Sequence, residues 1–193
     1  MIRKIGFYIL SLWLLFLLII IITVEIPIYF GKEWEFVGFK FLITHNIVPI
    51  ICVMLLVIGY LSYFDFRYKT KGTPELSFEI TEIENVNYEN LTFLTTYIIP
   101  LVCFNFDNIR QEIVLLILLI VIGMIYIRTG LFYSNPTLAI LQFRLYKING
   151  VFRGNVAKSN IILIAREDLH KNDKIKYFIL DKNIFYAIKT KQL

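Results

Sequence analysis

The sequence predicts an α-helical polytopic membrane protein with four transmembrane helices and a small cytoplasmic β-rich domain, a barrel of the SH3 or OB type. Three observations lead to this fold class: long uncharged apolar stretches, basic residues beside alternate stretches, and strand-like alternation in the polar parts. Of the 193 residues, 58% are hydrophobic and 18% are charged, whereas a soluble domain carries about 25% charged residues. The composition therefore favours a chain largely surrounded by lipid.

The first apolar stretch, Ile5–Val24, contains twenty residues without a charge. At about 1.5 Å per helical residue it is about 30 Å long, which matches the hydrocarbon core of a bilayer. A signal peptide has a shorter apolar core of about 7–15 residues and a cleavage site of small residues. No such site follows Val24, so we interpret the stretch as a retained anchor.

Three further apolar stretches follow: Phe41–Phe64 with twenty-four residues, Leu91–Phe106 with sixteen, and Ile113–Ile127 with fifteen. The last two are short, but Arg128 can extend its aliphatic stem along the apolar surface and lengthen the fourth. We therefore predict four spans. Three spans with one re-entrant segment is the alternative.

Basic residues predict the orientation of the spans. Arg3 and Lys4 precede the first span, and Arg67, Lys69 and Lys71 follow the second. The part after the fourth span carries twelve lysines and arginines but four acidic residues. All of these clusters fall on one side of the membrane, and the positive-inside rule places that side, with both termini, in the cytoplasm.

The polar segments predict one β-rich domain. The predicted organisation is residues 1–64 for the first two spans, 65–90 for a linker and strand, 91–134 for the last two spans, and 135–193 for the β-rich part that packs with 75–83. Apolar and polar residues alternate over Glu75–Ile83, which is typical of a half-buried strand. Asn135 and Pro136 predict the start of a short helix that ends near Leu141.

Further strands are predicted after that helix. They are Gln142–Ile148, closed by Gly150, then Ser159–Ala165, and then Ile175–Leu180 and Ile184–Lys189 as a hairpin around Asp181–Asn183. Five short strands favour a closed barrel, because closure removes exposed strand edges. A small open sheet is the alternative.

The sequence offers no catalytic constellation, so we expect neither an enzyme nor a bound metal or cofactor. The two histidines lie far apart, and no phosphate-binding loop or metal-ligand spacing is present. His45 and Asn46 are candidate intramembrane polar residues that could join helices; contact with lipid headgroups is the alternative for His45. Four basic residues of the β-rich part are candidate contacts to a partner or to membrane lipids, with a simple positive-inside bias as the alternative: Arg144, Lys147, Arg153 and Lys158.

Two short motifs resemble a known family. Phe93–Leu101, with the sequence FLTTYIIPL, opens the third span, and Asn135–Leu141, with the sequence NPTLAIL, leads from the fourth span into the β-rich part. With this layout they resemble KwaA, the membrane component of the Kiwa anti-phage defence system. The resemblance implies a homo-oligomer in the bacterial inner membrane that responds to phage at the envelope.

The resemblance also implies a separately encoded cytosolic effector, a KwaB-like protein, through which nucleic acid would be contacted only indirectly. The expected function is therefore a sensor and anchor subunit that recruits and regulates a DNA-binding effector. The alternative is a small oligomeric ion channel or transporter subunit, because the third span carries polar residues such as Thr92, Thr95 and Thr96.

Overall fold

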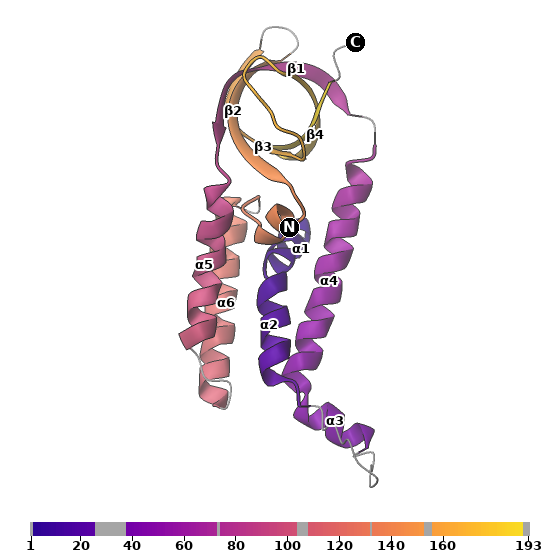
Figure 1. The fold of residues 1–193 in the computed structure, drawn as a ribbon, viewed down its shortest axis with the longest axis vertical. Coiled ribbons are helices and arrows are strands. Elements are labelled where there is room, and N and C mark those ends of the chain that lie inside the picture. The colour runs from indigo at the N-terminus through magenta and orange to yellow at the C-terminus, as the bar shows by residue number, and fades with distance from the viewer. Residues whose placement is uncertain are drawn as a thin grey trace.

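The structure, a computed structural model, describes residues 2–25, 38–72, 74–103, 108–131, 133–152 and 156–190. It is elongated, with a β-barrel at one end and long helices running away from it (Figure 1). The helices are α1 (Ile2–Ser11), α2 (Trp13–Thr23), α3 (Phe39–His45), α4 (Ile47–Lys69), α5 (Tyr88–Cys103), α6 (Ile109–Thr129) and α7 (Pro136–Ile140). The strands are β1 (Glu75–Asn85), β2 (Arg144–Phe152), β3 (Val156–Ala165), β4 (Lys174–Asp181) and β5 (Ile184–Lys189).

The first predicted span is not one straight helix, because α1 and α2 meet at an angle of 52°. At the bend the backbone N–H of Leu12 is shared between the carbonyls of Tyr8, at 3.3 Å, and Ile9, at 3.2 Å. The Thr137 hydroxyl donates to the Leu10 carbonyl at 2.7 Å. A side chain that takes a carbonyl from the helical ladder in this way bends the helix.

The second predicted span is also interrupted. We expected one helix over Phe41–Phe64, but α3 ends at His45 and α4 begins at Ile47, continuing to Lys69. Pro49 gives the physical reason: it has no N–H to donate to the His45 carbonyl, and its ring would clash with that carbonyl in a continuous helix. A proline is tolerated in the first turn of α4, so the chain starts a new helix there.

Two helices of the described residues, α4 and α6, are long and apolar enough to cross a membrane, and the bent pair α1–α2 would make a third if it is one span. Large apolar side chains point outward from both; Leu61 and Leu116 are 61% and 58% exposed. Helix α5 has sixteen residues and does not join this set. The end of the predicted third span, residues 104–106, lies outside the described residues.

The five strands form a closed barrel in the order β1-β2-β3-β5-β4, in which β3 and β5 are parallel and the other pairs are antiparallel. The predicted barrel is therefore confirmed, and the open sheet is wrong. Strand β1 pairs with both β2 and β4, so a segment that precedes α5 closes a barrel whose other strands follow α7. Buried apolar side chains such as Ile80, Ile148 and Leu163 fill its interior.

Gly150 does not end its strand as predicted, because β2 continues through it to Phe152. The register between β2 and β3 shifts between Ile148 and Gly150, which marks a bulge. A Cβ atom at Gly150 would lie 2.9 Å from the Phe78 ring and 3.0 Å from the Glu79 carbonyl oxygen. The glycine therefore allows β1 to approach β2 closely instead of terminating it.

Candidate functional site at the junction of helices and barrel

A cluster of buried polar side chains lies where α7 crosses the bend between α1 and α2. Asn135 is fully buried, and its Nδ2 donates to the Phe7 carbonyl at 3.2 Å. Its backbone N–H donates to Asn90 Oδ1 at 2.9 Å, and the Thr137 hydroxyl donates to the Leu10 carbonyl. We call Asn90, Asn135 and Thr137 the junction cluster. Its hydrogen bonds fasten α5 and α7 to α1, and paired polar groups in a dry interior hold their partners in one arrangement.

Local sequence explains why Asn135 occupies this position. Its Oδ1 accepts from the backbone N–H groups of Thr137 at 3.0 Å and Leu138 at 3.3 Å, so it caps α7 as predicted. Pro136 follows at the first helical position, where a missing N–H costs nothing. The cap leaves Nδ2 free to reach α1, a contact between residues 128 positions apart that sequence reasoning missed.

Aromatic rings join the helices to the barrel beside the junction cluster. Phe66, near the end of α4, is 1% exposed and stands edge-on to three rings, each with its centroid 5.7 Å away. These rings belong to Phe7 of α1, Phe143 before β2, and Tyr186 of β5. We call the four residues the aromatic hub. Because one ring touches α1 and the barrel at once, movement of α4 relative to either must disturb the hub.

An ion pair also connects the first helix to the barrel. Lys4 Nζ of α1 lies 2.7 Å from Asp181 Oδ2 at the end of β4. The hydrogen bond from Lys4 holds the pKa of Asp181 below its usual value, and burial opposes this effect without cancelling it. The N-terminal turn of the first helix is thus tied to the β4–β5 hairpin.

We expect this ion pair to give the protein an acid-sensitive share of its stability. A carboxyl group whose pKa is lowered by folding stabilises the folded state above its unfolded pKa of about 3.9, and that share is lost as the pH falls through the lower folded pKa. Thermal unfolding in detergent should therefore show a decline below about pH 4. Asp181→Asn should reduce stability at pH 7 and make the acid decline shallower; an unchanged profile would contradict the assignment.

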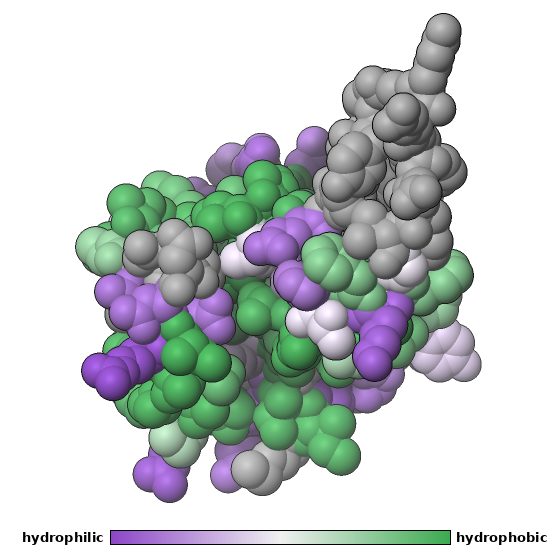
Figure 2. All heavy atoms as spheres, turned by 90° about the horizontal axis from the view of Figure 1, so that it is seen from below, coloured by the Kyte–Doolittle hydropathy of each residue, from purple (hydrophilic) through white to green (hydrophobic). Residues whose placement is uncertain are grey.

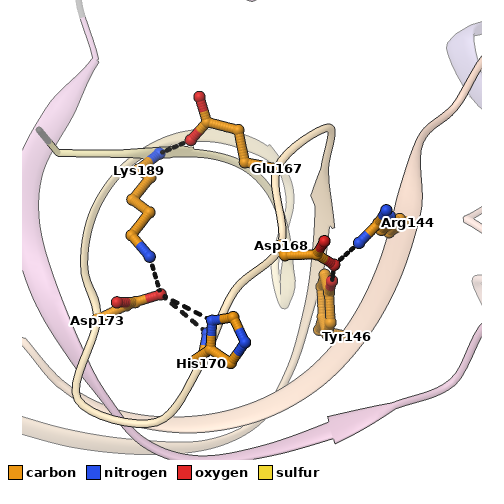
Figure 3. Close-up of polar contacts among 7 residues, drawn as sticks. All are labelled: Arg144, Tyr146, Glu167, Asp168, His170, Asp173 and Lys189. Carbon is orange, nitrogen blue, oxygen red and sulfur yellow. Dashed lines mark hydrogen bonds and ion pairs between the residues drawn. The ribbon is translucent and has the colours of Figure 1, made fainter.

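The four predicted basic contacts are not gathered into one patch. Arg144, at the start of β2, forms an ion pair with Asp168, which also accepts from the Tyr146 hydroxyl at 3.3 Å (Figure 3). Lys158 lies on β3 opposite Gly150, with its ammonium 4.8 Å from the centre of the Phe152 ring. Arg144 and Gly150 are six positions apart on β2, or roughly 20 Å of strand.

Lys147 lies between them, exposed on β2 and opposite Glu84 of β1. Arg153 lies outside the described residues. Of the described candidates, Arg144 is already paired with a carboxylate, and Lys147 and Lys158 lie at separate positions on β2 and β3.

The loop between β3 and β4 is fastened to β5 by charged residues (Figure 3). Lys189 Nζ lies 2.8 Å from Asp173, and the Lys189 backbone N–H donates to Glu167 at 3.0 Å. Desolvation raises the pKa of Asp173, but hydrogen bonds and charges from Lys189 and His170 together outweigh it, so the pKa is below its usual value. These contacts organise a turn, and no group of three metal-binding side chains occurs within the described residues.

The two predicted intramembrane polar residues lie at the opposite end of the helices and do different things. His45 is exposed and stacks on the Phe41 ring at 3.9 Å. Asn46 is buried; its Oδ1 accepts from the Glu25 N–H at 2.8 Å, and its Nδ2 donates to the carbonyls of Glu25 and Leu42, both at 2.9 Å. Asn46 therefore fastens the end of α2 to the break between α3 and α4.

Taken together, the contacts at the junction can transmit a change in helix packing to the barrel. The aromatic hub and the pair of Lys4 with Asp181 attach the barrel to α4 and α1, and the junction cluster fastens α5 and α7 to α1. These contacts join folded elements to one another.

Comparison with known proteins gives the chain a family. Residues 3–186 match the family model described as anti-phage protein KwaA. The chain is also 40% identical over 187 residues to the Kiwa protein KwaA of Escherichia coli O55:H7 (strain RM12579 / EPEC), covering 97% of this chain and 96% of that protein. No solved structure matches it. The resemblance inferred from the two short motifs is confirmed.

Proposed function

The chain belongs to the KwaA family of anti-phage proteins, and from this premise we propose that it is the membrane-bound sensor and anchor subunit of a Kiwa defence system. It recruits and regulates a separately encoded, KwaB-like cytosolic effector that binds DNA. It acts without catalysis of its own. The single observation that carries this proposal is a well-packed barrel fastened through buried contacts to apolar helices.

The proposed location is the bacterial inner membrane, with four passes and both termini in the cytoplasm. The bent pair α1–α2, helix α4 and helix α6 supply three passes, and the apolar stretch Leu91–Phe106, most of which lies in α5, supplies the fourth. Basic residues at the barrel end, such as Arg3 and Arg67, support this orientation. Exposed apolar side chains on α4 and α6 support contact with lipid and with further copies of the chain.

The barrel is the proposed docking module for the effector. A closed five-stranded barrel supports the assignment to the OB type, in which strand faces and loops serve as binding surfaces. Lys147 and Lys158 on the β2–β3 ribbon are the proposed contacts to an acidic face of the effector. A disturbance of the bilayer shifts the helices, and the aromatic hub carries this shift to the barrel.

Charge reversal tests the docking surface. We expect Lys147→Glu combined with Lys158→Glu to weaken co-purification of the effector by about tenfold at low salt, and less at high salt, because exposed charges steer association and are screened by ions. The matched control is Lys174→Glu with Lys176→Glu, which makes the same charge change at exposed positions on β4. All variants should remain in the membrane fraction. Equal binding by both double variants would refute the assigned surface.

The alternative function, a channel or transporter subunit, has less support. The hydroxyls of Thr92, Thr95 and Thr96 donate to carbonyls of their own helix α5, at 3.2, 2.8 and 2.6 Å respectively. Hydroxyls engaged in this way satisfy the local backbone and do not form a shared polar path.

A further inference from the structure

A cavity of about 890 Å³ opens between the helix pairs at the end of the molecule away from the barrel. Its walls come from α2, α3, α4, α5 and α6; apolar residues such as Leu18, Val48, Ile98 and Leu101 outnumber the polar ones. Figure 2 views this end of the molecule directly and shows apolar atoms over much of it, with hydrophilic residues among them. The volume lies within the roughly 300–1,000 Å³ typical of small-molecule sites.

The occupant must suit a hydrocarbon environment, because this inference rests on the membrane placement in the proposed function. Water finds polar partners at Glu25, Thr44 and Glu112, but few along apolar side chains such as Leu18, Val48 and Ile98, which are left for an apolar occupant. A helix of a second copy is about 10–12 Å across, so the cavity would take only about two turns of it. Acyl chains are thin and flexible and can fill an irregular space of this size.

The mouth of the cavity carries a charge pattern that selects a headgroup. Glu25, after α2, and Glu112, in the first turn of α6, both line it, with Thr44 nearby. Among the described lining residues, His45 is the one basic side chain, and none is lysine or arginine. The two carboxylates therefore have no permanent cation among the described residues of the cavity wall, and a ligand that brings a hydrogen-bonding cation complements them.

We propose that this cavity binds one phospholipid with an ethanolamine headgroup. Its acyl chains lie against α2, α4, α5 and α6, and its ammonium group donates hydrogen bonds to Glu25 and Glu112. A choline headgroup has the same net charge but no N–H to donate, and a glycerol headgroup leaves the phosphate charge uncompensated against the carboxylates. The site thus prefers phosphatidylethanolamine to phosphatidylcholine, and either of them to phosphatidylglycerol.

The proposed ligand also connects the cavity to sensing. A lipid seated between α2 on one side and α5 and α6 on the other fixes their spacing. A disturbance of the surrounding bilayer that withdraws this lipid lets the two sides approach, and the helices lead from there to the junction cluster.

The test uses the full-length protein reconstituted in vesicles with equal amounts of the three lipids, all carrying two oleoyl chains. The protein is extracted in detergent, and retained lipids are counted by native mass spectrometry. We expect phosphatidylethanolamine to be retained over phosphatidylcholine. Glu25→Gln with Glu112→Gln should reduce this preference about fivefold, as expected for two partly exposed ion pairs. The control Glu79→Gln with Glu84→Gln, on exposed positions of β1, should keep it.

A second variant tests the cavity itself. Ile98→Trp fills the space and should reduce retention of all three lipids. Equal retention of the three lipids by the wild type, or an unchanged preference in the Glu25 and Glu112 variant, overturns the proposal. The proposal is also overturned if the protein retains no lipid and forms an oligomer that Ile98→Trp dissociates. The cavity would then belong to an interface between copies of the chain. Effector co-purification, measured in parallel, tests the proposed function separately.

Discussion

Replacement of Phe66 by alanine is expected to lower the free energy of unfolding by about 3–5 kcal/mol, the usual cost of deleting a buried aromatic side chain. The ring is 1% exposed and contacts Phe7, Phe143 and Tyr186 edge-on. Its removal leaves a cavity between α1, α4 and the barrel's β5. Thermal unfolding in detergent should show a midpoint lower by roughly 6–20 °C.

Phe64 provides a matched control for this change, because it is the same residue type on the same helix and is 61% exposed. Phe64→Ala removes the same atoms but only from the outer surface of α4, so we expect little change in detergent. Phage protection should fall in cells that carry Phe66→Ala and persist with Phe64→Ala. Similar losses in the two variants would mean that the hub does not couple the barrel to the helices.

Local patterns in the sequence were sufficient to predict the barrel. Alternation marked β1, and the polar turn around Lys182 and Asn183 marked the hairpin of β4 and β5. Asn135 followed by Pro136 marked α7 correctly. In each case the structure is determined by residues within a few positions of one another, so the local sequence is sufficient to predict it.

The shape of the helices depends on contacts between residues far apart in the sequence, which local patterns do not reveal. The bend at Leu12 involves a hydroxyl from Thr137, which is 127 residues from its acceptor, Leu10. The break at Asn46 had a local signal in Pro49. A proline cannot hydrogen-bond to the carbonyl four residues before it, so a helix that contains Pro49 in its first turn does not extend back through His45. The prediction of one span over Phe41–Phe64 therefore missed the new helix start at Ile47.

The candidate site was predicted in part for the same reason. Counting charges identified Arg144 but could not show that Asp168 neutralises it. Asn46 was identified as polar within an apolar run, yet its partners, the backbone groups of Glu25, lie on another helix. Phe66 had no distinguishing local signal, because an aromatic residue near the end of a span is also typical of the membrane interface.

Replacement of Asn135 by alanine should have the second large effect, a loss of about 2–4 kcal/mol. The change removes the cap of α7, which contributes about 1 kcal/mol, and leaves the buried Phe7 carbonyl without its donor, which costs about 1–3 kcal/mol. Asn135→Ser retains an oxygen that can cap the helix but cannot reach Phe7. Asn135→Ser should therefore restore only the part of the unfolding free energy that comes from the helix cap.

Asn108→Ala separates the two contributions most directly. Asn108 caps α6 by accepting from the Arg110 N–H at 3.0 Å, but it is exposed, so its loss should cost only the cap. The difference between the unfolding free energies of the two alanine variants then measures what the junction cluster adds. If Asn135→Ala costs no more than Asn108→Ala, the hydrogen bond to α1 contributes nothing, and the barrel must be held to the helices by the aromatic hub and the pair of Lys4 with Asp181.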